Sequence, residues 1–567
     1  MDRVQIGAIS LAVVLLVLSV WLAPSAPTGP VAPQPTAQAG SAPTEPSPVV
    51  PPAPEQPETA VTAPAEPEVA RRTTKLSNGQ VELLVDNQGG AVRSIALLKY
   101  ADRVPRSDVP VQPVELVTMG QTGVLLSSLG DADYPGVERA RFDVVEETPA
   151  KVVHRLRWGG SQVTRTLELD ESGYGGSLWV KVENLGSEPV RPSFEIQLFG
   201  QDGDISAPDH FQNFSLVASV DGSVQRKPLL SIGKPGWFSS LFGGSSQPSV
   251  TRYAPPVDWV GVDSQYFLLA VIPDDAAKSW AAYEPIGINS GRSVLGFPYN
   301  AGAGVSELPP GQQLERHYRL FFGPKVGELV SAVDPRLKSA AIVGWVWVQP
   351  LVHVFASTLK WFHDVLIPNY GVAIILITIL LRLAVFPLNQ RAMRSMKRMS
   401  VIAPEMKVIQ EKYKEDPARL QQEMMALYRR QGMNPLTAMG GGCIPMLIQM
   451  PFMIALYYAL QSSIELRHAP FALWITDLSS PENLFSIAGL PIRPLPLLMG
   501  VAMIAQQWLT PSTQDAQQKQ MMLMMSGVFI LVFYQFPSGL VLYWLVSTLL
   551  GILQQVMVNQ QPIPAKA

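Results

Sequence analysis

Charged residues are scarce in this chain of 567 residues, since Asp, Glu, Lys and Arg together make up 16% of it. An average soluble domain carries about 25%. Apolar residues reach 47%, so the deficit indicates that part of the chain lies in lipid. The net charge of −3 gives no global basic field and argues against nucleic acid as the main partner.

Cysteine and histidine are rarer still, with 1 and 6 copies respectively. Cys443 has no second cysteine with which to form an internal disulfide, and no Cys/His group has the spacing of metal ligands. A Gly-x-x-x-x-Gly-Lys phosphate loop is missing as well. We therefore expect neither a metal nor another cofactor.

The first apolar run spans residues 6–22, long enough to cross a bilayer once. It could be a cleaved signal peptide, but Pro24 interrupts the cleavage site, so we interpret residues 1–23 as a retained signal anchor. Residues 24–75 are rich in Pro and Ala and have little to bury, which predicts a disordered tether.

Residues 76–333 show a different pattern, in which apolar and polar side chains alternate. Leu178, Val180 and Val182 interleave with Lys181 and Glu183, and Gly-containing turn pairs separate many such runs. Period two over many short runs predicts a large all-β domain, a sandwich. Its histidines stand in no catalytic motif.

The C-terminal part is predicted to be helical and membranous. Residues 334–369 contain a Trp-rich amphipathic stretch, 344–362, which predicts a helix lying at the bilayer interface, followed by a connector. Apolar stretches then follow at 370–387, 443–460 and 490–509, and a last one at 520–557 is broken by Phe536-Pro537-Ser538-Gly539. With the first anchor, this predicts six transmembrane helices, five of them in a core at 370–557.

The loop after the second span carries ten Lys and Arg against five Asp and Glu over residues 389–431. Basic loops face the cytoplasm, which predicts that both termini and a tail at 558–567 are cytoplasmic and that the β domain lies outside. Within the hairpin predicted at 389–436, four methionines fall near helical spacing: Met393, Met396, Met399 and Met406. They could pack a core or bind varied apolar sequences, and the basic face could be solvated or face lipid or RNA.

Arg382 is the most informative residue, because it stands inside an apolar span and arginine in hydrocarbon costs about 3 kcal/mol. It could snorkel to the nearby interface, or it could line a watery cavity between helices. Thr378 lies one turn earlier on the same face. Gln449, Gln507 and Ser547 add polar groups to other spans, and together they favour the cavity. The spans predicted here contain no acidic residue, which argues against an ion transporter.

Several longer motifs resemble those of YidC-type membrane protein insertases. They are NPL at 434–436, GCIPMLIQMP at 442–451, APFALWI at 469–475, FPSGLVLYW at 536–544, QEMMALY at 422–428 and, in the β region, WVGVDSQYF at 259–267. The resemblance covers almost the whole chain.

The resemblance implies a five-helix core around a hydrophilic cavity that is open to the cytoplasm and lipid, and a periplasmic β-supersandwich related to sugar mutarotases. The family's cavity arginine and threonine map onto Arg382 and Thr378. Its substrate-contacting aromatic pair maps onto Tyr543 and Trp544, where the family more often has Tyr at the second position. The implied partners are nascent membrane proteins, the Sec translocon with its accessory subunits, the ribosome, the signal-recognition pathway and membrane lipids.

Such a protein is an insertase of the bacterial inner membrane and not an enzyme. Two other classes stay open at this point. A membrane-tethered sugar-binding or mutarotase-like enzyme would need a paired acid and base in a β pocket, and a channel or transporter would conduct ions without nascent chains.

Overall fold

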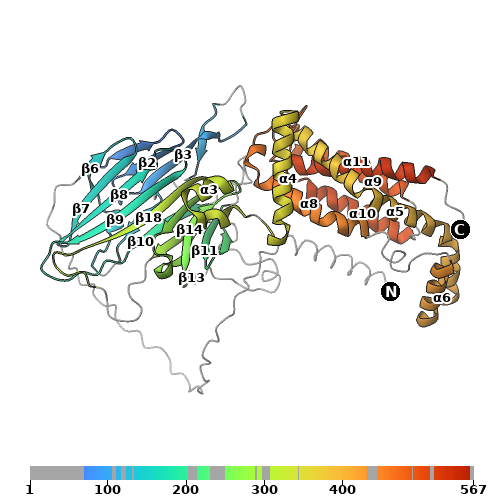
Figure 1. Cartoon of the computed structure of the whole chain (residues 1–567), viewed down its shortest axis with the longest axis horizontal. Helices are drawn as coiled ribbons and strands as arrows, with labels where there is room; N and C mark the ends of the chain where they lie inside the picture. Colours follow the sequence, from blue (N-terminus) through green and yellow to red (C-terminus); the bar gives the residue numbers. More distant parts are fainter. Residues whose placement is uncertain are drawn as a thin grey trace, which may run out of the picture. The chain divides into compact units, whose positions relative to one another are not determined.

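A computed structural model describes residues 69–104, 110–116, 123–130, 133–201, 214–229, 250–287, 290–296, 307–342, 344–430, 444–487, 490–510 and 516–561 (Figure 1). The predicted signal anchor, most of the predicted tether and Cys443 lie outside these residues.

The N-terminal described part is built from antiparallel sheets. A four-stranded sheet has the order β1-β2-β3-β4, a five-stranded sheet β13-β16-β17-β10-β5 and a nine-stranded sheet β12-β11-β14-β15-β18-β9-β8-β7-β6. The strands are β1 Thr73–Ser77, β2 Val81–Asp86, β3 Val92–Ala101, β4 Pro113–Glu115, β5 Leu126–Ser128, β6 Asp143–Glu147, β7 Lys151–Trp158, β8 Ser161–Leu169, β9 Gly175–Asn184, β10 Glu195–Gln201, β11 Ser215–Val220, β12 Ser223–Pro228, β13 Thr251–Tyr253, β14 Val257–Asp263, β15 Phe267–Pro273, β16 Trp280–Gly287, β17 Ser290–Gly296 and β18 Gln313–Pro324. The prediction of an all-β domain is confirmed.

The alternation in the sequence explains this sheet structure. In β8 every second side chain is buried, and residues of all three sheets contribute to one hydrophobic core. Trp259 in β14 is fully buried there, and its indole Nε1 donates to the carbonyl of Arg336 at 3.1 Å. Strand pairing therefore places alternate apolar side chains between the sheets, where burial stabilises each by about 2 kcal/mol.

The helical part begins with α3 Gly327–Val333 and a short 3₁₀ turn at Pro335–Ala341. Helix α4, Gln349–Trp361, corresponds to the predicted amphipathic stretch: Val352, Phe355 and Leu359 are buried along one face, while Val354 and Trp361 are exposed. The other helices are α5 Tyr370–Lys412, α6 Pro417–Arg430, α8 Ile444–Ser462, α9 Pro494–Leu509, α10 Ala516–Phe533 and α11 Ser538–Gln560, with a small hairpin of β19 Phe485–Ile487 and β20 Leu490–Ile492 before α9.

Helix α5 is longer than the predicted span. We predicted a span at 370–387 and a helical hairpin at 389–436, and α5 continues through Pro387 and Pro404 to Lys412, so one helix contains the predicted span and the first arm of the hairpin (Figure 1). A proline removes one helical hydrogen bond without forbidding the helix around it. Contacts with α11 hold this region, since the amide of Gln554 donates to the carbonyl of Phe386 at 3.1 Å. The break predicted between α10 and α11 is confirmed, because α10 ends at Phe533 and α11 starts at Ser538.

By length and composition, two of the described helices, α5 and α11, can cross a membrane. A third span arises if Pro335–Ala341 and Val346–Leu366, which are bent by 91°, count as one. Helix α9 and residues 520–533 of α10 are apolar but shorter. The count of six spans therefore stays a prediction.

Candidate functional site: a polar cluster between apolar helices

Arg382 is anchored to the last helix of the chain. Its Nε donates to Ser547 Oγ at 3.0 Å, and Nη2 donates to the Ser547 carbonyl at 2.5 Å. Ser547 is buried, whereas Arg382 is half-buried. The two bonds join α5 to α11 through a charged group, and charge-assisted bonds of this kind are about twice as strong as neutral ones.

Gly551 lies one turn beyond Ser547 on α11, where two polar side chains come close to the helix backbone. A Cβ at this position would lie 2.9 Å from Gln506 Nε2 and 3.4 Å from Arg382 Nη2. Arg382 and Gln506 therefore converge on the same point from α5 and α9. The sequence reasoning missed Gln506 and Gly551, and a short side chain one helical turn from Ser547 was the signal that could have found the glycine.

Tyr543 and Gln449 extend this cluster to α8. Gln449 Nε2 donates to the Tyr543 hydroxyl at 2.6 Å, and Tyr543 is buried. Tyr543 lies one helical turn before Ser547 on α11, on the same face. Thr378 is fully buried, and its Oγ1 donates to the carbonyl of Ile374 at 2.6 Å, so its hydroxyl proton serves its own helix.

The structure directs two predicted site residues elsewhere. Gln507 Nε2 donates to Ser526 Oγ at 2.5 Å and so faces α10. Trp544 packs against α10 as well, with its ring 4.8 Å from that of Phe533 and 6.2 Å from that of Phe529. Arg382, Ser547, Tyr543 and Gln449 thus come together, while Gln507 and Trp544 belong to the contact between α10 and its neighbours.

The four hairpin methionines divide into two pairs. Met399 and Met406 pack against a small core of Ile402, Leu427 and Tyr428 between α5 and α6. Met393 and Met396 are half-buried and lie outside that core. Met399 and Met406 therefore fit the interpretation that the methionines pack a core. Met393 and Met396 stay the candidates for binding a partner.

The base of the hairpin is fastened to the end of α11. Lys397 Nζ donates to the carbonyls of Val558, Asn559 and Gln561 at 3.3, 2.7 and 2.7 Å. The Val558 carbonyl also accepts from the Gln561 amide at 3.3 Å, and a cation near a helix C-terminus is favourable. The base of the hairpin is therefore held against the C-terminal end of α11, the helix that carries Ser547. Among the described residues, no group of three or more His, Cys, Asp and Glu could hold a metal ion.

Described helices that are apolar and long enough to cross a membrane, together with a large β domain, are the features of a membrane protein with an extramembrane domain. Comparisons with known proteins make this specific. The family model described as the YidC periplasmic domain matches residues 73–354, and that described as the 60Kd inner membrane protein matches residues 361–565.

Among curated relatives, a membrane protein insertase YidC of Pelobacter propionicus is 36% identical over 489 residues, which cover 84% of each chain. One of Aeromonas hydrophila is 30% identical over 521 residues, 88% of each chain. Among solved structures, an active YidC insertase with its first transmembrane domain resolved is similar at 19% identity and a TM-score of 0.35, over 87% of this chain and 95% of that one. The chain belongs to the YidC family of membrane protein insertases.

Proposed function

We propose that this chain inserts integral membrane proteins into the bacterial inner membrane and that it does so as an insertase and chaperone, without catalysing a covalent reaction. The relatives that share at least 30% of its residues are named insertases. The observation that carries the proposal is a guanidinium held between apolar helices α5, α9 and α11 by Ser547, beside Gly551 and the side chain of Gln506.

The polar cluster lowers the free-energy barrier for a short polar segment of a client protein that must cross the membrane. Nη1 of Arg382 makes no hydrogen bond to a described residue and is not fully buried, so it is available to water or to an acidic group of a passing chain. A hydrated pocket shortens the apolar distance that a client's polar segment must cross. Transfer of one polar group into hydrocarbon costs about 4 kcal/mol or more, and much less where the group stays in contact with water. The cavity opens to the cytoplasm and to lipid in this proposal.

The client's apolar segment supplies the driving force. Moving it from water into lipid releases about 25 cal/mol per Å² of apolar surface, so no nucleotide is needed. Met393 and Met396 on the hairpin meet that segment first, since methionine adapts to varied apolar sequences. The cavity then hosts the polar tail, with Thr378 and Tyr543 in its wall.

The proposed partners follow from this cycle. Nascent membrane proteins arrive from the ribosome through the signal-recognition pathway, and clients with several spans are handed over beside the Sec translocon and its accessory subunits. The protein spans the membrane several times, with both termini in the cytoplasm and the β domain in the periplasm.

Adjacent glutamines on α9 allow a sharp test. In a Cys443→Ser background, single cysteines replace Gln506, which faces Arg382, and Gln507, which faces α10. In inside-out membrane vesicles from cells depleted of their own insertase, a membrane-impermeant cationic thiol reagent should modify Gln506→Cys and stop insertion of a small two-span client. It should leave Gln507→Cys largely unmodified and active, because thiol chemistry requires a hydrated thiolate.

The outcome that contradicts the proposal is equally specific. If both cysteines resist the reagent while a short hydrophobic maleimide labels Gln506→Cys, the cluster is dry and serves only to join helices. Complementation by the unmodified Cys443→Ser chain is the control for folding and expression.

A further inference from the structure

A cavity lies at the start of α5, the opposite end of that helix from the basic hairpin. It is lined by residues of α4, the start of α5 and the turn that follows α8: Ala356, Ser357, Leu359, Lys360, Tyr370, Ser463, Glu465 and Leu466. Its volume is about 150 Å³, several times the ~15 Å³ that a single water needs. The cavity is therefore large enough for a small polar group.

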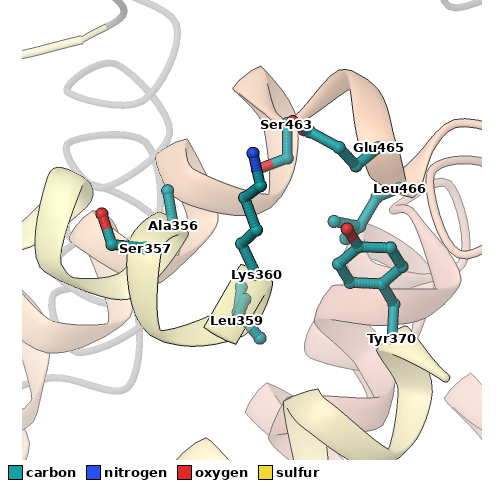
Figure 2. A pocket seen from close by; sticks show the side chains of 8 residues that line it. All are labelled: Ala356, Ser357, Leu359, Lys360, Tyr370, Ser463, Glu465 and Leu466. Carbon is teal, nitrogen blue, oxygen red and sulfur yellow. The ribbon is translucent and has the colours of Figure 1, made fainter. Parts of the chain in front are cut away.

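The cavity presents two opposite charges that do not neutralise each other. Figure 2 shows Lys360 extending from α4 toward Ser463, with Glu465 and the ring of Tyr370 beside it. Both charged side chains are exposed, and within the described part of the chain neither forms an ion pair. The neighbouring acid, Asp364, pairs instead with His363 at 2.8 Å. A cation and an anion around one small space fit a ligand that carries both charges.

The surroundings place this space at a lipid surface. Next to the cavity, Trp361, Val365, Leu366 and Ile367 are all more than two-fifths exposed, although they are apolar. Exposed Trp and aliphatic residues beside a charged cavity are typical of the bilayer interface, where the rings lie at headgroup level. A lipid could then place its headgroup in the cavity and its acyl chains against these residues.

We propose that this cavity binds the headgroup of phosphatidylethanolamine. Lys360 donates to the phosphate, and Glu465 accepts from the primary ammonium, while the Ser463 hydroxyl donates to the Ala459 carbonyl at 2.7 Å and only lines the wall. A phosphatidylglycerol headgroup lacks the cation for Glu465. A choline headgroup has no N–H to donate and prefers cages of several aromatic rings, whereas the only aromatic lining residue, Tyr370, already has one face stacked on His363 at 4.0 Å.

Lipid binding at this cavity is separate from the proposed insertion activity and is measured without a client protein. The full chain, purified in detergent and stripped of lipid, is titrated with phosphatidylethanolamine, phosphatidylcholine and phosphatidylglycerol, and bound lipid is counted by native mass spectrometry. We expect about tenfold tighter binding of phosphatidylethanolamine than of either competitor. Glu465→Gln should bring phosphatidylethanolamine down to the affinity of phosphatidylcholine, and Lys360→Gln should weaken all three by about tenfold.

Matched variants separate this site from lipid bound around the helices. Lys338→Gln and Glu328→Gln remove the same charges at exposed positions outside the cavity and should change nothing, and Lys360→Arg should retain binding. Equal or tighter binding of phosphatidylglycerol by the wild type would overturn the proposal in favour of a simple anion site. Unchanged preferences in both cavity variants, with unaltered thermal unfolding, would overturn it in favour of general lipid contact.

Discussion

His154 gives a quantitative prediction about the β domain. It lies in β7 opposite Arg165 of β8, is fully buried, and packs with its ring 6.4 Å from that of Phe142. Neither ring nitrogen has a hydrogen-bond partner within the described residues. Burial, with the nearby charge of Arg165, lowers the pKa of His154 from 6.5 to about 3, so the folded domain keeps this ring neutral.

The pH dependence follows from the direction of that shift. Below pH 6.5 the unfolded chain binds a proton at this residue that the folded chain does not, so stability is fully present above pH 6.5 and falls as the pH drops toward 3. Each pH unit in that window costs about 1.4 kcal/mol. At about pH 4.5 the loss reaches about 3 kcal/mol, a large part of a typical domain stability of about 5–15 kcal/mol.

The assay is hydrogen exchange of β7 and β8 in the full chain in detergent, corrected for the pH dependence of the intrinsic exchange rate. His154→Leu keeps a similar volume, removes the titration and deletes two buried polar atoms that lack partners, so it should be no less stable at pH 7 and should show little loss between pH 6.5 and 4.5. The pKa values of Asp86 and Asp334 are lowered, so protonation of these two carboxylates reduces stability only below about pH 4, outside the range of the assay. An equal loss in wild type and His154→Leu would refute the reasoning.

Three further substitutions probe other parts of the fold. Asp263→Asn should lower the free energy of unfolding by about 3–5 kcal/mol, measured by thermal unfolding of the full chain. The buried carboxylate accepts from Arg226 at 3.0 Å and from Lys325 at 3.1 Å. Lys397→Met should speed hydrogen exchange in the last turn of α11, where three carbonyls lose their cation; unchanged exchange there would contradict it. Gly500→Ala should cost about 1–3 kcal/mol, since its Cβ would lie 2.2 Å from a side-chain carbon of α10, and a thermal shift of the purified chain measures the loss.

The sequence predicts what depends on local pattern. Alternating side chains are sufficient to identify β8 and β9 as strands of a half-polar sheet. Pro537, directly before α11, marks a break because proline lacks a backbone donor. Pro417 at the start of α6 follows the same logic, since a first turn needs no amide donor there.

Rotation about a helix axis could not be predicted in the same way. Adjacent residues on a helix point about 100° apart, so Gln506 and Gln507 face different neighbours, but α9 is apolar on several sides and its sequence has no polar face to orient it. The choice between them depends on α10 and α11, which lie later in the chain and pack by shape. The same limitation applies to Trp544, whose ring packs on Phe533 and whose assignment to substrate stays a prediction.

The role of Arg382 depends on both its place in the sequence and its contacts in the structure. An arginine has five N–H donors, and two of them are used by Ser547, which leaves three without a protein acceptor among the described residues. Snorkelling alone would direct the guanidinium along α5 toward the nearer membrane surface, whereas in the structure it points sideways to Ser547 of α11. A cation that only joined two helices would be most stable with its donors satisfied by protein, because each unmet buried donor costs about 1–3 kcal/mol. The remaining donors are therefore most simply satisfied by water or by a client's carboxylate, which is why the hydration of Gln506 decides between an insertase cavity and a structural link.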